Sequence, residues 1–143
     1  MTVDTDRPEV PHVDPQTKAI DYAVLEQLRV DLEDEDGSAV ASVVSIYVDS
    51  SRALIPDLAA ALRSGDTTAA ARVAHALATP TIMVGARPLG TLLQRVQIGA
   101  AGAVVQPAEL TALAEMIMSE ADRAIATLVL WLNDLGLGRP STN

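Results

Sequence analysis

Apolar residues recur along the chain after residue 18 at spacings of three and four, which is the period of an amphipathic α-helix. The first such stretch is short, about three turns within residues 19–32. Its predicted apolar face holds Ile20, Ala23, Val24 and Leu28. No segment alternates with the period of two that is typical of a half-buried strand. The pattern therefore predicts an all-α protein.

The second stretch is long. We expect a helix that begins at Ser38, with Ser38 or Asp36 as its N-cap, and that runs to about Arg63. Pro56 lies inside it and predicts a bend. Its predicted apolar positions are Val40, Val43, Val44, Tyr47, Leu54, Leu58 and Leu62.

Two shorter helices are expected to follow. Asp66 or Thr67 caps the third helix, and Gly85 ends it. Pro88 suits the first turn of a fourth helix, which is expected to end at about Gln97. The residues after it are expected to form a loop or a frayed helix end.

The last helix is expected to begin at Pro107, with Glu109 favourably placed in its first turn. Its predicted apolar seam holds Leu110, Leu113, Ile117, Ala121, Ala124, Leu128, Trp131 and Leu135. Long helices joined by short connections pack most simply as an up-down bundle.

At 143 residues the chain has the size of one domain. Residues 1–17 carry prolines and alternating charges without apolar periodicity, so we predict a disordered tail that includes His12. The helical bundle is expected over residues 18–137, and residues 138–143 are expected to be a flexible C-terminus.

Charge and composition exclude several classes of function. The formal net charge is −9, from 19 acidic and 10 basic residues, so the protein repels phosphate backbones and no nucleic-acid partner is expected. The absence of cysteine excludes thiol catalysis and a thiolate zinc site. We recognise neither a secretory signal nor an apolar run of ~18 residues, and so predict a soluble cytoplasmic protein without membrane insertion.

The acidic run at residues 31–37 is interpreted as a solvated loop. The alternative, a calcium loop, lacks the ligand spacing and the closing glutamate.

His75 lies in the third helix among small and aliphatic residues. At about 100° per residue, the apolar positions of this helix fall within one arc, and His75 lies roughly 150° from its centre. The arc holds Ala70, Val73, Ala74, Leu77, Thr81 and Val84. The side chain of His75 is therefore expected to point away from the core.

Apart from one arginine, the residues within a turn of His75 are small or apolar, unlike a typical solvated face. These neighbours are Ala71, Arg72, Ala78, Thr79 and Ile82. They leave the imidazole accessible and offer a partner something to bury, so we interpret this face as a docking surface around a reactive group. The alternative is that the N-terminal helix covers the face and that His75 packs beneath it.

A solvent-facing imidazole is largely neutral at cytoplasmic pH, so one ring nitrogen is free to act as a nucleophile. Phosphoryl transfer needs such a nucleophile, in-line access and positive charge near the transferring oxygens. Arg72, three residues before His75, could supply that charge or be a plain surface residue. No G-x-S-x-G elbow, H-x-x-x-H pair or carboxylate cluster accompanies the histidine, so neither a serine hydrolase nor a metal site is expected.

The segment IYVDSSRALIPDLAAALRSGDTTAAARVAHALATPTIMVGA resembles the histidine phosphotransfer (HPt) domain. The residues that match the family pattern in register are Tyr47, Leu54, Leu58, Leu62, Gly65, Asp66, Ala74, His75, Leu77, Gly85 and Ala86. The likeness is recognisable over about residues 47–95 and continues as a helical pattern over roughly residues 20–135. It implies an antiparallel up-down four-helix bundle with an additional short N-terminal helix.

The same resemblance implies a function. His75 would accept a phosphoryl group from the aspartate of a response-regulator receiver domain, free or within a hybrid histidine kinase, and pass it on. The receiver domain would bring the magnesium and most of the catalytic groups. We therefore expect a phosphocarrier rather than an independent enzyme, with no cofactor and no metal of its own.

The sequence departs from the family pattern just after His75. Ala78 stands in place of the family's lysine, Thr79 stands in place of its glycine, and Pro80 should kink the helix. In one interpretation, Arg72 replaces the lysine and relay activity persists. In the other, the bundle docks a receiver or kinase, or dimerises, without being phosphorylated.

The end of the last helix is apolar almost all round, at Leu128, Leu130, Trp131, Leu132 and Leu135. It could form a dimer interface or a docking helix, or it could be the bundle's most buried end. We favour a monomer.

Overall fold

The structure, a computed structural model, describes residues 18–102 and 106–135. These residues form five α-helices and no β-strand. The helices are α1 (Tyr22–Asp31), α2 (Ser38–Ser64), α3 (Thr67–Met83), α4 (Arg87–Gly102) and α5 (Pro107–Leu135). The all-α class predicted from the helical period is confirmed. The predicted tail and C-terminus lie outside the described residues.

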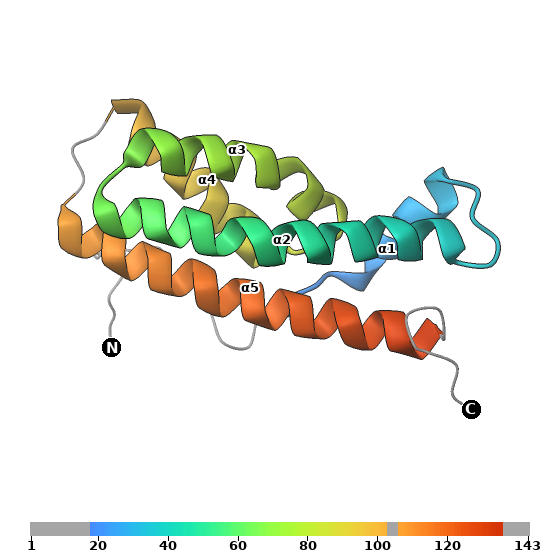
Figure 1. The fold of residues 1–143 in the computed structure, drawn as a ribbon. Helices are drawn as coiled ribbons and strands as arrows, with labels where there is room; N and C mark the ends of the chain where they lie inside the picture. The colour runs from blue at the N-terminus through green and yellow to red at the C-terminus, as the bar shows by residue number, and fades with distance from the viewer. Residues whose placement is uncertain (1–17, 103–105, 136–143) are drawn as a thin grey trace, which may run out of the picture.

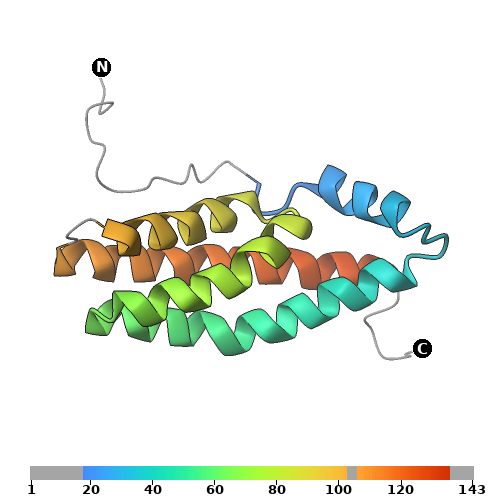
Figure 2. The ribbon, with the colours of Figure 1, turned by 90° about the horizontal axis from the view of Figure 1, so that it is seen from above.

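The two longest helices, α2 and α5, lie side by side, and α3 and α4 pack against each other next to them (Figure 1). Because α3 also packs on α2 and α4 on α5, the four helices share one hydrophobic core. The short helix α1 lies at one end, beside the beginning of α2 (Figure 2).

The paired helices differ in length: α3 and α4 have 17 and 16 residues, whereas α2 and α5 have 27 and 29. At about 1.5 Å per residue, the long pair extends roughly 15 Å past the short pair. This overhang consists of the beginning of α2 and the last turns of α5, and α1 packs beside it (Figure 1).

The predicted seam of α5 is buried up to Leu128 but not beyond it. In the overhang Leu132 is buried instead, while Trp131 is half-buried and Leu135 is 36% exposed. The reason is that α4 no longer flanks α5 here, so only the side that faces α2 is covered. The apolar end of α5 is thus only partly the bundle's interior, through Leu128 and Leu132, and Leu130 is 63% exposed.

The apolar positions predicted for α2 are buried, except Val43 and Leu54, which are half-buried. The helix continues without a break through Pro56, which is exposed. Among the described helices, α2 alone has a length and a mean hydropathy, 27 residues and 1.2, that would allow it to cross a membrane. Its most apolar positions pack against α3 and α5, which accounts for that composition within the bundle.

The acidic run between α1 and α2 caps α2. The N-cap residue is Gly37, with a φ of 84°, and not Ser38 or Asp36 as predicted. The N–H of Ser38 donates to the Asp36 carboxylate at 2.9 Å, and the N–H of Val40 donates to the buried carboxylate of Asp34 at 2.9 Å. The hydrogen bonds from Ser38 lower the pKa of Asp36. Two carboxylates therefore meet the positive end of the helix dipole, so the run is more than a solvated loop.

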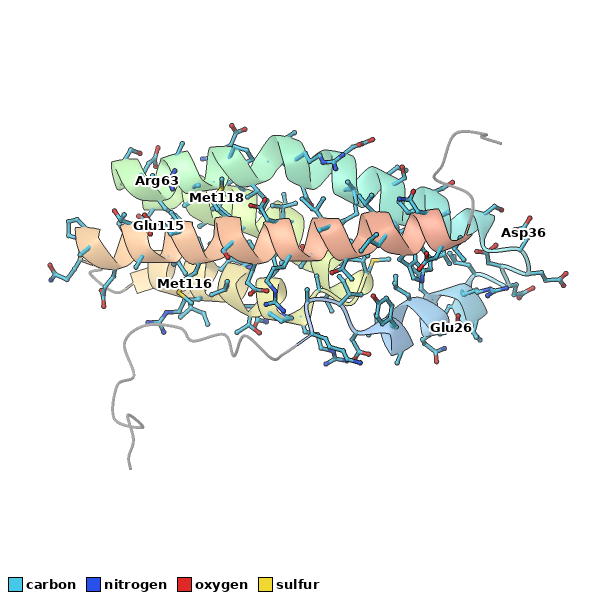
Figure 3. The ribbon with its side chains drawn as sticks, turned by 90° about the horizontal axis from the view of Figure 1, so that it is seen from below. Glu26, Asp36, Arg63, Glu115, Met116 and Met118 are labelled. Atoms are coloured by element: carbon cyan, nitrogen blue, oxygen red, sulfur yellow. The ribbon has the colours of Figure 1, made fainter. Side chains whose placement is uncertain are left out.

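Figure 3 places Asp36 at the overhang end of the bundle, with Arg63 and Glu115 toward the other end. It also shows Met118 on the side of α5 that faces α2, and Met116 on the side toward α4. Both methionines are half-buried, as expected for residues at the two edges of a buried stripe.

The first helix begins at Tyr22, later than its apolar pattern suggested. Ile20 therefore precedes the helix, although it is fully buried. The residue that α1 buries is Leu25, whereas Ala23, predicted on the buried face, is exposed.

The third helix has the predicted cap, because the N–H of Ala69 donates to the Asp66 carboxylate at 3.0 Å. It continues past Pro80 and ends just before Gly85, which has a φ of 83°. The fourth helix runs beyond Gln97, so the segment expected to be a loop or a frayed end begins as regular helix. Residues 103–105 lie outside the described part of the chain.

Candidate functional site

His75 lies in the middle of α3 and is exposed. The predicted core stripe faces the other way: Ala70, Ala74, Leu77, Thr81 and Val84 are buried, and Val73 is half-buried. The alternative that α1 covers His75 is wrong. The N-terminal segment contacts α3 near the turn that joins α3 to α4, and the imidazole of His75 remains exposed. The helical spacing correctly predicted which side of α3 presents the histidine.

One hydrogen bond orients the imidazole. Nδ1 of His75 lies 3.2 Å from Oε1 of Gln97 on α4. An amide oxygen can only accept a hydrogen bond, so Nδ1 carries the proton and Nε2 keeps its lone pair. The ring is therefore held with its nucleophilic nitrogen away from α4.

The contact with Gln97 depends on how closely α3 and α4 approach each other. A Cβ added at Gly90 of α4 would meet Cδ1 of Ile82 on α3, so a larger residue there would require the end of the Ile82 side chain to move. In the opposed register of the two helices, Gly90 lies against Ile82 and Gln97 lies opposite His75. Ile82 is held in this contact and is still 49% exposed.

The predicted neighbours of His75 lie on the same side of α3. Ala71 and Ala78 are half-buried, whereas Arg72 and Thr79 are exposed. Among the described residues, Arg72 makes no ion pair or hydrogen bond. The imidazole is thus surrounded by short side chains, an exposed guanidinium and an exposed hydroxyl.

Charge separates this side of the bundle from the rest of the chain. The α3–α4 hairpin contains Arg72, Arg87 and Arg95 and no Asp or Glu, so all 19 acidic residues lie elsewhere in the sequence. The hairpin itself therefore carries a positive charge in a protein that is otherwise strongly anionic, although the Asp21 carboxylate pairs with Arg87.

The turn between α3 and α4 is fastened to the segment that precedes α1. The N–H of Asp21 donates to the carbonyl of Gly85 at 2.8 Å, and the Asp21 carboxylate pairs with Arg87 at 3.1 Å. A Cβ at Gly85 would lie 2.5 Å from the carbonyl oxygen of Asp21. Glycine is required there both for its positive φ and for this approach.

A groove of about 330 Å³ runs between α2 and α3, on the side of α3 that faces α2 and next to the turn that carries His75. Apolar side chains line most of it, including the exposed Ile46 and Met83. Pro80 forms part of its wall, and because proline has no N–H, the carbonyl of Ala76 lacks its usual helical donor.

A buried hydrogen bond joins α2 to α3 beneath this groove. The hydroxyls of Tyr47 and Thr81 lie 2.8 Å apart. Burial raises the pKa of Tyr47 because the phenolate would lose its solvation.

The sequence pattern does not identify Gln97 as a site residue. His75 and Gln97 lie far apart in sequence, and helical spacing relates residues only within one helix. The contact between them depends on the register of α3 against α4. The one sign of this close approach in the sequence was the small residue Gly90 in α4.

Comparison with models of known protein families gave a match. The family model described as Hpt domain matches residues 42–124, a span that contains His75 and Gln97. Searches of curated proteins and of solved structures gave no match.

Proposed function

The chain belongs to the Hpt domain family, and on that premise we propose that it is a phosphocarrier of a two-component phosphorelay, with His75 as the phosphorylated residue. One observation carries the assignment to this residue. His75 is exposed and its Nδ1–H is engaged by Gln97, which leaves Nε2 available to a partner. We also propose that α2 to α5 form the antiparallel four-helix bundle of the family over residues 18–137, with α1 as the additional helix.

The proposed step is reversible and needs few protein groups. Nε2 attacks the phosphorus of a receiver's aspartyl phosphate in line. The N–P bond forms as the P–O bond to the aspartate breaks, and the carboxylate leaves with the electron pair of that bond. The ring gains a positive charge, which the amide oxygen of Gln97 stabilises by accepting the Nδ1–H hydrogen bond. The reverse reaction passes the phosphoryl group to a second receiver.

The surface around His75 suits a receiver domain. Ala71, Ala78 and Ile82 offer small and apolar contacts, and the apolar groove between α2 and α3 extends the same face. Arg72, which makes no ion pair or hydrogen bond within the described part of the chain, can meet a partner whose phosphorylated site is anionic. Arg72 is the nearest cation along α3 and takes the place of the lysine that is absent at Ala78. We propose a cytoplasmic location, where such receivers operate.

Phosphotransfer profiling tests the proposal. The purified chain is incubated with each phosphorylated receiver domain encoded in the same genome, and acid-labile phosphate on the chain is measured. We expect labelling by at least one receiver and none in His75→Gln, because the nucleophile is gone. The melting temperature of this variant should be unchanged, because an exposed side chain contributes little to packing.

The chain supplies a matched control, because His12 is its second histidine. His12→Gln should be labelled like the unmodified chain. Gln97→Ala should be labelled roughly ten- to a hundredfold more slowly, since it loses a hydrogen bond to a ring that becomes positively charged, about 1.5–3 kcal/mol. Labelling that survives in His75→Gln, or no labelling by any receiver, would contradict the proposal.

A further inference from the structure

Thr79 has an available hydroxyl one helical turn after His75. Two other exposed or half-buried threonines donate into their own helices: Thr91 to the carbonyl of Arg87 at 3.1 Å, and Thr127 to the carbonyl of Arg123 at 2.9 Å. Among the described residues, the Thr79 hydroxyl has no hydrogen-bond partner. It is therefore free to donate to a group outside the helix.

The direction of helical side chains brings this hydroxyl toward the imidazole. Side chains in an α-helix incline toward its N-terminus, so the side chain of Thr79 lies over the turn that carries His75. The Cβ atoms of residues four apart are about 6 Å from each other, a gap that a phosphoryl group on Nε2 would bridge. Arg72 lies three residues before His75 on the same side of α3 and is exposed. Ala78, with only a methyl group, contributes no donor.

We propose that Thr79 is a phosphoryl-binding residue of this chain, and that its hydroxyl and the guanidinium of Arg72 together hold the phosphoryl group on His75. This inference rests on the proposed function and assigns a specific contact to a residue that the sequence placed only in the surface around His75. A neutral hydroxyl holds phosphate less tightly than an ammonium group. The carrier would thus give up its phosphoryl group more readily than one with a lysine at position 78.

Four variants separate a hydrogen-bonding role from a steric one. Thr79→Val keeps the shape and removes the hydroxyl, Thr79→Ser keeps the hydroxyl, and Thr79→Gly removes both. Thr91→Val is the matched control, because that hydroxyl already donates to its own helix. Circular dichroism melting checks that each variant folds like the unmodified chain.

Potassium phosphoramidate, a small-molecule donor, phosphorylates the purified proteins without a partner, and ³¹P NMR follows formation and hydrolysis of phosphohistidine. We expect Thr79→Val and Thr79→Gly to form phosphohistidine about fivefold more slowly, the loss of one hydrogen bond. Thr79→Ser and Thr91→Val should stay within about twofold of the unmodified chain.

Either of two results would overturn this inference and leave the proposed function intact. One is an equal rate of phosphohistidine formation in Thr79→Val and the unmodified chain. The other is a faster rate in Thr79→Gly, which would show that Thr79 acts sterically. Absence of phosphohistidine in the unmodified chain would overturn the proposed function together with this inference.

Discussion

The long helices α2 and α5 and the hairpin of α3 and α4 are built from different residues. The long pair buries large aliphatic side chains along its length, such as Leu58 and Ile117, and carries much of the chain's acidic charge outside. In the hairpin, α3 buries mainly small residues, such as Ala70 and Ala74, α4 buries leucines, such as Leu92, and neither helix has a carboxylate. Large residues give a helix pair its burial energy, whereas small residues let two helices approach until side chains on both meet at one point. The proposed chemistry thus lies on α3, the helix that buries few large side chains, while α2, α4 and α5 bury most of the large ones.

The largest expected effect tests the stabilising role of the long pair. Leu58→Ala removes a fully buried side chain from α2 and should lower the free energy of unfolding by about 2–5 kcal/mol, through lost burial and the cavity it leaves. Urea denaturation followed by circular dichroism measures the change. Leu130→Ala is the control: this leucine is 63% exposed, and its truncation should cost under about 0.5 kcal/mol. Similar losses in the two variants would contradict the comparison.

A smaller effect tests how the hairpin is fastened. Gly85 and Gly65 both have a positive φ, 83° and 81°, so alanine is strained at either position. A Cβ at Gly65 meets nothing within 4 Å, whereas at Gly85 it meets the backbone of Asp21. Gly65→Ala should cost about 1 kcal/mol, and Gly85→Ala should cost roughly 1–2 kcal/mol more. Equal losses in urea denaturation would show that the contact with Asp21 does not matter.

The smallest effect concerns the junction between the two regions, where Tyr47 of α2 meets Thr81 of α3. Burial raises the pKa of Tyr47 in the folded state, so the unfolded chain loses this proton at a lower pH. The contribution of Tyr47 to stability is therefore complete below about pH 10, the ordinary tyrosine pKa, and is lost as pH rises toward the folded value.

Urea denaturation between pH 9 and pH 11 should show this alkaline loss of stability, and Tyr47→Phe should reduce it. Tyr22, which is 45% exposed, supplies the matched control, because Tyr22→Phe should leave the pH dependence unchanged. An identical alkaline loss in Tyr47→Phe would contradict the assignment.

Periodicity predicted most of the fold because each helix has one continuous buried face. It correctly predicted that the α5 seam from Leu110 to Leu128 is buried and that His75 is exposed. Capping preference correctly predicted Asp66 as the N-cap of α3. It could not predict that Trp131 and Leu135 would be partly open, because that depends on where α4 begins and ends in space.

The features of the site that the sequence did not predict also depend on how separate elements are placed in space. The bond from His75 to Gln97 arises from the register between two helices, and the capping role of Asp34 arises from the path of a loop. A pattern within one helix contains neither relation. The resemblance indicated that Gly85 matters, and the structure supplies the reason in the backbone of Asp21.

The unequal helix lengths have a consequence for motion. In the overhang α2 and α5 support each other without α3 and α4, so their backbone amides there should exchange with solvent through local opening long before the whole bundle unfolds. His75 belongs to the hairpin, away from those turns. The far end can therefore fray and reform while the imidazole stays held by Gln97.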